Sequence, residues 1–262
     1  MDNKTIWIIV AVIVVIGGIY FITRGPSSTD TTSTATPSTT ANNTSQTTPT
    51  PAAPQGRVVF SATDAAANMG NVSQVNMQIS EIDVHNATDG WVTASVTPVT
   101  FDLLALNAKK QSTLMSNITL KAATYDQVRF NIASVSIKTT AGVIKDARLP
   151  SNEMAIATSL VVNKDSTASA NFDFLARSSL FTTDAGDYIF APVVTTHTES
   201  NAKLEIATTG IVTIDSGHVD NTNTVAMDID GSVKANFRIS PTAKLAIGTD
   251  GSIKLNTTLP IK

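Results

Sequence analysis

The segment Leu120–Ile137 reads LKAATYDQVRFNIASVSI, and its apolar residues alternate with polar ones. Because successive side chains of a β-strand point to opposite faces, this alternation predicts a strand with one buried face. The apolar positions change from even to odd along the run: Val128, Phe130, Ile132, Val135 and Ile137. A change of parity inside a continuous run predicts a β-bulge or a tight bend, here near Ala133-Ser134.

Alternating runs of the same kind occupy the chain from Arg57 onward. One of them, Val75–Val84, also changes parity and predicts a β-bulge near Ser80-Glu81. Another keeps its parity and presents four apolar residues on one face: Ala168, Ala170, Phe172 and Phe174. Abundant Thr, Val and Ile, with only 5 % aromatic residues, further favour sheets with small side chains over helices.

Asp-Gly pairs lie between alternating segments at Asp89-Gly90, Asp230-Gly231 and Asp250-Gly251. This dipeptide between two strands is a strong indication of a β-hairpin. Short turns of helix are expected only at Phe101–Leu106 and Asp64–Asn68. Many short strands separated by turns predict an all-β fold, and more specifically a β-sandwich.

The N-terminal segment Ile6–Ile22 reads IWIIVAVIVVIGGIYFI and contains no charged side chain. An apolar run of this length predicts a transmembrane anchor over residues 6–23, with the lipid bilayer as its partner. Trp7 and Tyr20 lie near its two ends, where aromatic rings prefer the membrane interface. The alternative is a cleaved signal peptide, although no small-x-small site follows the apolar run. We expect residues 1–5 to lie in the cytoplasm and most of the chain outside the cell.

Residues 24–56 are rich in Ser, Thr and Pro, and Asp30 is the only charged residue from 27 to 55. This composition cannot fill a core and predicts a disordered stalk of the kind that carries O-linked glycans. Asn42 and Asn43 each begin an N-x-[ST] triplet and are candidate glycan acceptors. Four further triplets fall in or near predicted strands, where glycosylation is less expected: Asn71, Asn86, Asn117 and Asn256.

Six segments in this order resemble one known family. They are IDVHNATDGWV (Ile82–Val92), TFDLLAL (Thr100–Leu106), LKAATYDQVRFNIASVSI (Leu120–Ile137), LPS (Leu149–Ser151), ANFDFLARSSL (Ala170–Leu180) and AGDYIFAPVV (Ala185–Val194). The chain is similar over about residues 57–197 to the domain-of-unknown-function family numbered 4382. That family usually has Gly where Ala123 stands here, a departure that bears on turn geometry. The resemblance implies an envelope-associated, immunoglobulin- or prealbumin-like β-sandwich and no established reaction.

Residues 198–262 lie beyond the resemblance and carry further alternating segments. We expect a separate C-terminal β module there, packed on the sandwich of residues 57–197. The alternative is an extension of the first sheet, which the alternation alone cannot distinguish from a separate module.

The composition excludes several classes of function. The chain has no cysteine, so it has no disulfides, thiolate nucleophiles or cysteine-ligated metals. A net charge of −3 with 15 % charged residues provides no basic field for nucleic acid. His85, His197 and His218 are too scattered for a zinc site, which needs three or four convergent ligands. Asp83 and His85 share the strand face opposite Ile82 and Val84, so both are expected to point to solvent.

The richest group of carboxylates is Asp215, Asp220, Asp228 and Asp230, and calcium takes such oxygen ligands from loops. The segment DIDG resembles the opening of a calcium loop, but the twelfth position from Asp228 is Ile239 rather than Glu. The preferred interpretation is therefore a hairpin turn with solvated carboxylates and no cofactor, and calcium is the minor alternative.

These features together predict a non-catalytic surface module that serves in binding, adhesion or envelope structure. Its partner would be a surface protein or a glycan. One alternative is an accessory carbohydrate-binding module or a carbohydrate-active enzyme. Trp91 is the only tryptophan outside the apolar N-terminal run, which makes a poor aromatic platform for that alternative. A second alternative is a pilin-like filament subunit, but no basic-Gly cleavage site precedes Ile6.

Overall fold

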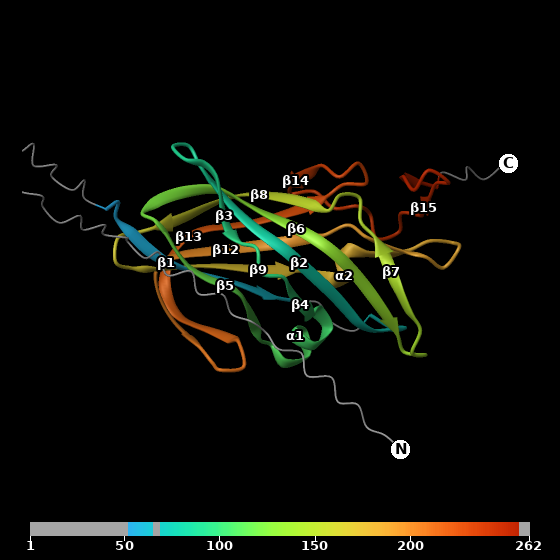
Figure 1. Ribbon diagram of the computed structural model, residues 1–262. Coiled ribbons are helices and arrows are strands. Elements are labelled where there is room, and N and C mark those ends of the chain that lie inside the picture. Colours follow the sequence, from blue (N-terminus) through green and yellow to red (C-terminus); the bar gives the residue numbers. More distant parts are fainter. Residues whose placement is uncertain (1–51, 65–68, 257–262) are drawn as a thin grey trace, which may run out of the picture. The chain divides into compact units, whose positions relative to one another are not determined.

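A computed structural model describes residues 52–64 and 69–256, and β-strands dominate these residues (Figure 1). The all-β prediction is therefore confirmed. The strands of the described part are β1 (Gln55–Thr63), β2 (Val72–Asn86), β3 (Gly90–Ser95), β4 (Val99–Asp102), β5 (Ser112–Lys121), β6 (Ala123–Thr139), β7 (Ile144–Arg148), β8 (Glu153–Val162), β9 (Thr167–Phe174), β10 (Leu180–Thr182), β11 (Tyr188–Phe190), β12 (Val193–Ile206), β13 (Ile211–Met227), β14 (Val233–Ala235), β15 (Leu245–Ile247) and β16 (Ile253–Leu255). Two short helices accompany them, α1 (Leu103–Lys109) and α2 (Ala176–Ser179).

The expected anchor, residues 6–23, lies outside the described residues, as do Asn42 and Asn43 and most of the expected stalk. Among the residues that are described, no helix has both the length and the apolar character needed to cross a membrane. The described residues all belong to one compact unit. Its first strand, β1, begins at Gln55, so the last residues assigned to the stalk already belong to the folded part.

The first sheet, sheet A, has the strand order β12-β9-β1-β5-β13-β14. Strand β1 runs parallel to β9 and antiparallel to β5. The long strand β13 pairs with β12 along most of its length, while its first residues, Ile211 and Val212, pair with Thr113 and Ser112 of β5. The ladder therefore returns to its starting strand, and the β12–β13 hairpin closes sheet A on itself.

The second sheet, sheet B, is built around β6, which pairs with β2 along one edge and with β7 and β8 along the other. The register between β2 and β6 shifts three times, because Ala133 is an extra residue on β6 and Ser73 and Ser80 are extra residues on β2. Both predicted bulges are thus confirmed, and they lie almost opposite each other on neighbouring strands.

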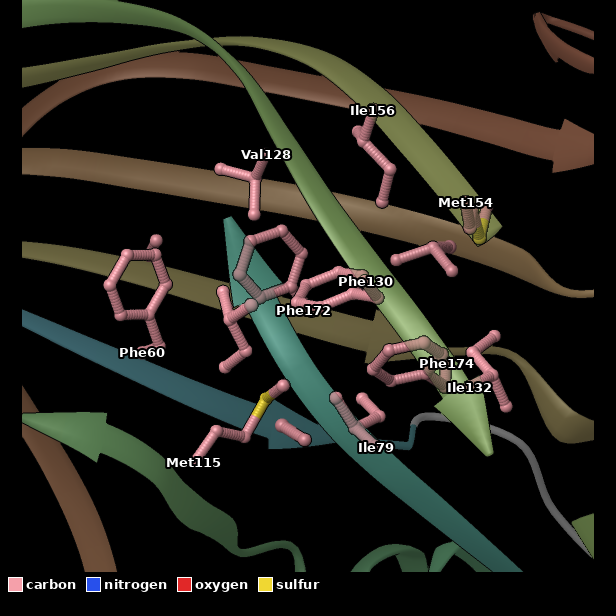
Figure 2. Close-up of a cluster of buried hydrophobic side chains, with 14 of the residues drawn as sticks. Phe60, Ile79, Met115, Val128, Phe130, Ile132, Met154, Ile156, Phe172 and Phe174 are labelled. Carbon is pink, nitrogen blue, oxygen red and sulfur yellow. The ribbon is translucent and has the colours of Figure 1, made fainter. Parts of the chain in front are cut away.

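The two sheets face each other across one hydrophobic core (Figure 2). Sheet A contributes Phe60, Phe172 and Phe174, and sheet B contributes Phe130 and Ile132, all of them buried. The rings of Phe130 and Phe172 meet edge to face, with centroids 4.7 Å apart and planes at 89°. This geometry suits the positive edge and negative face of aromatic rings, so it stabilises the contact between the layers beyond area burial alone.

Sheet A also buries its second face. Val59, Ser61 and Ser169 alternate with core residues along β1 and β9, yet each is at most 1 % exposed. The β12–β13 hairpin closes over them, and Figure 1 shows it in orange, curling beside β1 and β5. Since Val212 and Ala202 of this hairpin are also buried, a second small interior lies on the far side of sheet A from the main core.

Strand β12 crosses the boundary expected between residues 197 and 198, and it pairs with β9 as well as β13. Residues 198–227 are thus an extension of the first sheet, which was the alternative to a separate module. The following residues form the predicted hairpins, since Val225 pairs with Ala235 and Leu245 pairs with Leu255. They rest on a small satellite cluster of their own, made by Phe181, Ile189, Ala191 and Leu245 with partly buried neighbours.

Candidate functional site

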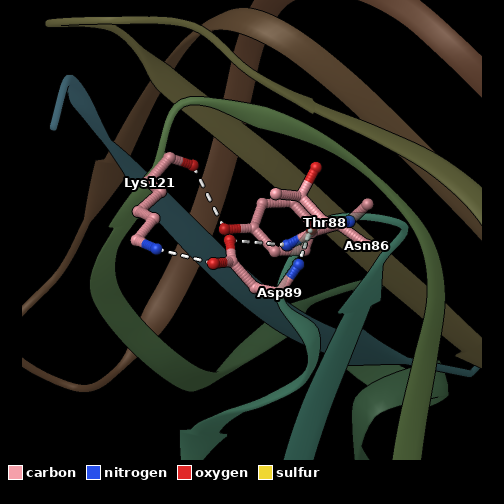
Figure 3. A network of polar contacts seen from close by, with 5 residues as sticks. Asn86, Thr88, Asp89 and Lys121 are labelled. Carbon is pink, nitrogen blue, oxygen red and sulfur yellow. Dashed lines mark hydrogen bonds and ion pairs between the residues drawn. The ribbon is translucent and has the colours of Figure 1, made fainter.

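The β2–β3 hairpin turn is fixed by its own side chains (Figure 3). Asn86 Oδ1 accepts hydrogen bonds from the backbone N–H groups of Thr88, at 2.9 Å, and Asp89, at 2.8 Å. Asn86 Nδ2 in turn donates to Asp89 Oδ2 at 3.3 Å. An Asn side chain that bonds the backbone two and three residues ahead stabilises a turn locally. Asn86 is only 2 % exposed, so this N-x-[ST] triplet does not present a free glycan acceptor.

The same turn is also tied to the other sheet. Lys121, at the end of β5, places Nζ 2.6 Å from Asp89 Oδ1, and its carbonyl accepts a hydrogen bond from Tyr125 at 3.1 Å. The hydrogen bonds from Lys121 and from Asn86 hold the pKa of Asp89 below its ordinary value. Burial, with the negative charge of Asp89, raises the pKa of Tyr125. The β2–β3 turn is therefore stabilised both through its backbone N–H groups, which bind Asn86, and through the side chain of Asp89, which binds Lys121.

Trp91 follows this turn and projects from the solvent side of sheet B. It is 39 % exposed, which is high for so large an aromatic residue. The guanidinium carbon of Arg129, on β6, lies 4.2 Å from the centroid of the indole ring. The imidazole of His85, on β2, lies at 5.2 Å with its plane tilted by 59°. Since Arg129 occupies one face of the indole, the exposed area of Trp91 is mainly its other face and its edge.

Arg129 is itself held in place. Its Nε and Nη2 atoms both donate to Asp83 Oδ2, at 3.1 and 2.8 Å, and Nη1 lies 3.7 Å from Glu153. The hydrogen bond to Asp83 raises the pKa of Arg129, so the guanidinium stays charged under Trp91. A fixed guanidinium beneath an indole forms a cation–π contact and prevents the ring from folding down further onto the sheet.

His85 completes the surface. Its Nδ1 lies 2.6 Å from Asp126 Oδ1, so the carboxylate accepts the Nδ1 proton. In the neutral ring, Nε2 then remains as a hydrogen-bond acceptor. Trp91, His85, Arg129 and their carboxylates therefore lie together on four neighbouring strands, and we call this group the Trp91 surface. It offers one aromatic face flanked by fixed donors and acceptors.

The sequence predicts that Asp83 and His85 both point to solvent. The predicted sheet face is correct for both residues, but the predicted exposure of Asp83 is wrong. Asp83 does lie on the outer side of sheet B, but it is only 6 % exposed. Arg129 donates to it from the neighbouring strand, and Trp91 lies over Arg129, so two long side chains cover the carboxylate. The alternation of the sequence gives the face of a residue, but it does not reveal which long side chains lie across it.

The other two histidines lie elsewhere. His197 is on β12, where Nδ1 is 2.9 Å from Thr222 Oγ1 and Nε2 is 2.9 Å from Glu199 Oε1. His218 lies on β13 and is exposed. Neither of them reaches the Trp91 surface, because both belong to sheet A.

The four candidate calcium carboxylates are not brought together. Asp220 accepts a hydrogen bond from Ser200 at 3.0 Å, and Asp228 binds Lys234 at 2.6 Å. Asp230 accepts from Ser232 within its turn, and this bond lowers the pKa of Asp230. Asp215 lies apart on β13. Over the described ranges, no three His, Asp or Glu side chains gather closely enough to hold a metal ion.

The fold and the Trp91 surface define a two-layer β-protein with one open, aromatic sheet face. A family model described as "Domain of unknown function (DUF4382)" matches residues 55–192, more than half of the chain. The chain belongs to this family. No curated protein and no solved structure shows a significant match.

Proposed function

We propose that this protein is a non-catalytic binding module at the cell surface, and that its Trp91 surface binds a saccharide. The proposal rests on one observation above all. Trp91 is 39 % exposed, and Arg129 lies against one of its faces, so the indole is held with its other face toward solvent. A pyranose ring has an apolar C–H face that fits such a plane, and its hydroxyl groups need donors and acceptors at the rim.

The surroundings of Trp91 meet the second requirement. His85 Nε2 is free to accept from a sugar hydroxyl, while Asp126 and Glu153 present exposed carboxylate oxygens. His85 and Asp126 hold each other at 2.6 Å, so a ligand that binds them would lose little affinity to the ordering of these two side chains. Only one aromatic plane is present, which suits the modest affinity of a module that acts in many copies on a surface.

The cellular setting of the proposal comes from the sequence. Residues 6–23 anchor the chain in the cell membrane, residues 1–5 are cytoplasmic, and the Ser/Thr/Pro-rich stalk carries the β-domain outward. As part of this proposal, the domain is an immunoglobulin- or prealbumin-like sandwich whose Trp91 surface faces neighbouring glycans. Adhesion or contact with the envelope would follow from that binding.

A glycan array probed with the full-length chain in detergent micelles tests the proposal. We expect retention on a defined set of glycans, and a loss of affinity of about tenfold or more for Trp91→Ala. Val96→Ala is a matched control, because Val96 is an apolar residue of the same sheet edge that is 69 % exposed and makes no aromatic platform. Binding that Trp91→Ala leaves intact, or an array without any retained glycan, would contradict the proposal.

A further inference from the structure

A pocket lies away from the Trp91 surface. One of its sides is formed by α2 and the start of β10, and the other side is formed by the segment that follows β14. Its volume is about 310 Å³. Arg177, Leu180 and Phe181 line one side, and Arg238 and Ile239 line the other. Only the first side belongs to the family-matched residues 55–192. The other side comes from the C-terminal extension, so the pocket exists because this chain continues beyond the family domain.

Two arginines at this pocket have no ionic partner within the described part of the chain, in contrast with Arg129. Arg177 and Arg238 are both exposed, and no carboxylate of the described residues lies within ion-pair distance of either guanidinium. Two positive charges at one concave site attract an anion, because each planar guanidinium can donate two parallel hydrogen bonds to an oxyanion.

The backbone on both sides is well supported. In α2, Ala176 and Ser179 are fully buried, and Ser179 Oγ donates to the carbonyl of Leu175 at 2.8 Å. On the other side, Ile239 packs into the satellite cluster, and the turn after it is closed by the bond from Ala243 N–H to the Ser240 carbonyl at 2.9 Å. Arg177 thus lies in α2, and Arg238 is the neighbour of Ile239, which packs into the satellite cluster, so a ligand need not organise the backbone.

We propose that this pocket binds a carboxylate-bearing ligand of monosaccharide size, such as a uronic acid. The volume lies at the small end of ligand sites and suits a single sugar ring. Arg177 and Arg238 would hold the carboxylate, while Leu180, Phe181 and Ile239 provide the apolar wall for the ring face. The site is separate from the Trp91 surface, and it stands or falls independently of the function proposed for that surface.

Calorimetric titration of the full-length chain in detergent micelles with sodium glucuronate tests this assignment. We expect a dissociation constant on the order of 1 mM. Glucose has the same ring without the carboxylate, so it should bind at least about tenfold more weakly. Inorganic phosphate is an oxyanion without a ring, and it should also bind more weakly. Equal heats with glucose and glucuronate, or tighter binding of phosphate than of glucuronate, would overturn the proposal.

Variants locate the binding. Arg177→Gln and Arg238→Gln should each weaken glucuronate binding by about tenfold, because each removes a charge-assisted hydrogen bond. Lys203→Gln is the matched control, since Lys203 is an exposed cation on β12. Both arginines are exposed, so the variants should melt at the temperature of the unmodified chain. A double arginine variant that melts normally and still binds glucuronate would contradict the site.

Discussion

The outer faces of the two sheets differ in a way that separates structure from function. On sheet A, the β12–β13 hairpin closes the strand ladder, and Val59, Ser61 and Ser169 are buried on the side away from the main core. On sheet B, the outer face stays open and carries Trp91 on Arg129, with His85 beside them. Both faces come from alternating strands, so the alternation does not decide which one meets solvent.

This difference between the outer faces of the two sheets determines where a ligand can approach the protein. Closure of sheet A places its second face in a small interior that a partner cannot enter. The open face of sheet B has long side chains fixed by charge pairs, and these hold an aromatic ring outward. Substitutions on the closed face should therefore change stability, while substitutions of exposed side chains on the open face, such as Trp91, should change binding more than folding.

The largest effect should come from a charge placed on the closed face. Val59→Asp puts a carboxylate at a fully buried position, and burial of an unpaired charge should cost at least about 3 kcal/mol. Ala157→Asp introduces the same carboxylate at an exposed position of sheet B, opposite Gln127. This substitution should lower the free energy of unfolding by less than about 0.5 kcal/mol. Urea unfolding of both variants measures the difference. Similar costs would show that the second face of sheet A is open to water.

The next effect concerns the support beneath Trp91. Arg129→Met removes both hydrogen bonds to Asp83, which is 6 % exposed, and should destabilise the fold by about 1.5–3 kcal/mol. Adding Asp83→Ala should recover part of that loss, because no uncompensated carboxylate then remains under the surface. Urea unfolding of the two single variants and the double variant gives the coupling. Strictly additive losses would mean that the pair contributes nothing.

Two buried serines on the closed face should respond with opposite signs. Ser169 Oγ is buried and has no hydrogen-bond partner among the described residues, whereas Ser61 Oγ accepts from Asn171 Nδ2 at 2.9 Å. Ser169→Ala should therefore raise stability by about 1 kcal/mol, and Ser61→Ala should lower it by about the same amount. Thermal melting of the pair checks the prediction. Destabilisation by Ser169→Ala would show that its hydroxyl finds a partner.

The smallest effect should be the pH dependence of the β2–β3 turn. Lys121 and Asn86 lower the folded-state pKa of Asp89 below the ordinary value of an Asp carboxyl. A lowered carboxyl pKa gives stability that is present above the unfolded-state pKa and is lost as the pH falls through the folded-state pKa. Melting temperatures between neutral pH and strong acid should fall slightly less steeply for Asp89→Asn. If the melting temperature of Asp89→Asn falls with acid as steeply as that of the unmodified chain, the Asp89–Lys121 ion pair is too exposed to contribute to stability.

Local patterns were enough to predict much of this fold. The parity changes located the bulges at Ser80 and Ala133, and the Asp-Gly pairs located the hairpins around Gly231 and Gly251. These features depend on residues close in sequence, where side-chain alternation and turn chemistry act directly. The short helix α1 was also expected, although it begins at Leu103 rather than Phe101.

The closure of sheet A and the Trp91 surface could not be predicted in this way. Closure needs Val212 of β13 to pair with Ser112 of β5, and the surface needs Trp91 of β3 to reach Arg129 of β6. Both depend on which strands become neighbours, and a single sequence does not state that. From the sequence, Trp91 after its Asp-Gly turn was interpreted as a poor aromatic platform, because the sequence does not reveal that Arg129 lies against the indole.

The fluorescence of Trp91 provides the most direct test of the account. In a Trp7→Phe chain, Trp91 is the only tryptophan, so its emission reports on the proposed binding plane alone. Titration with cellohexaose, chitohexaose and maltohexaose should change that emission saturably for at least one sugar and should protect it from iodide quenching. If a sugar binds by calorimetry while the emission and the quenching of Trp91 stay unchanged, the indole is not the binding plane and the central claim fails.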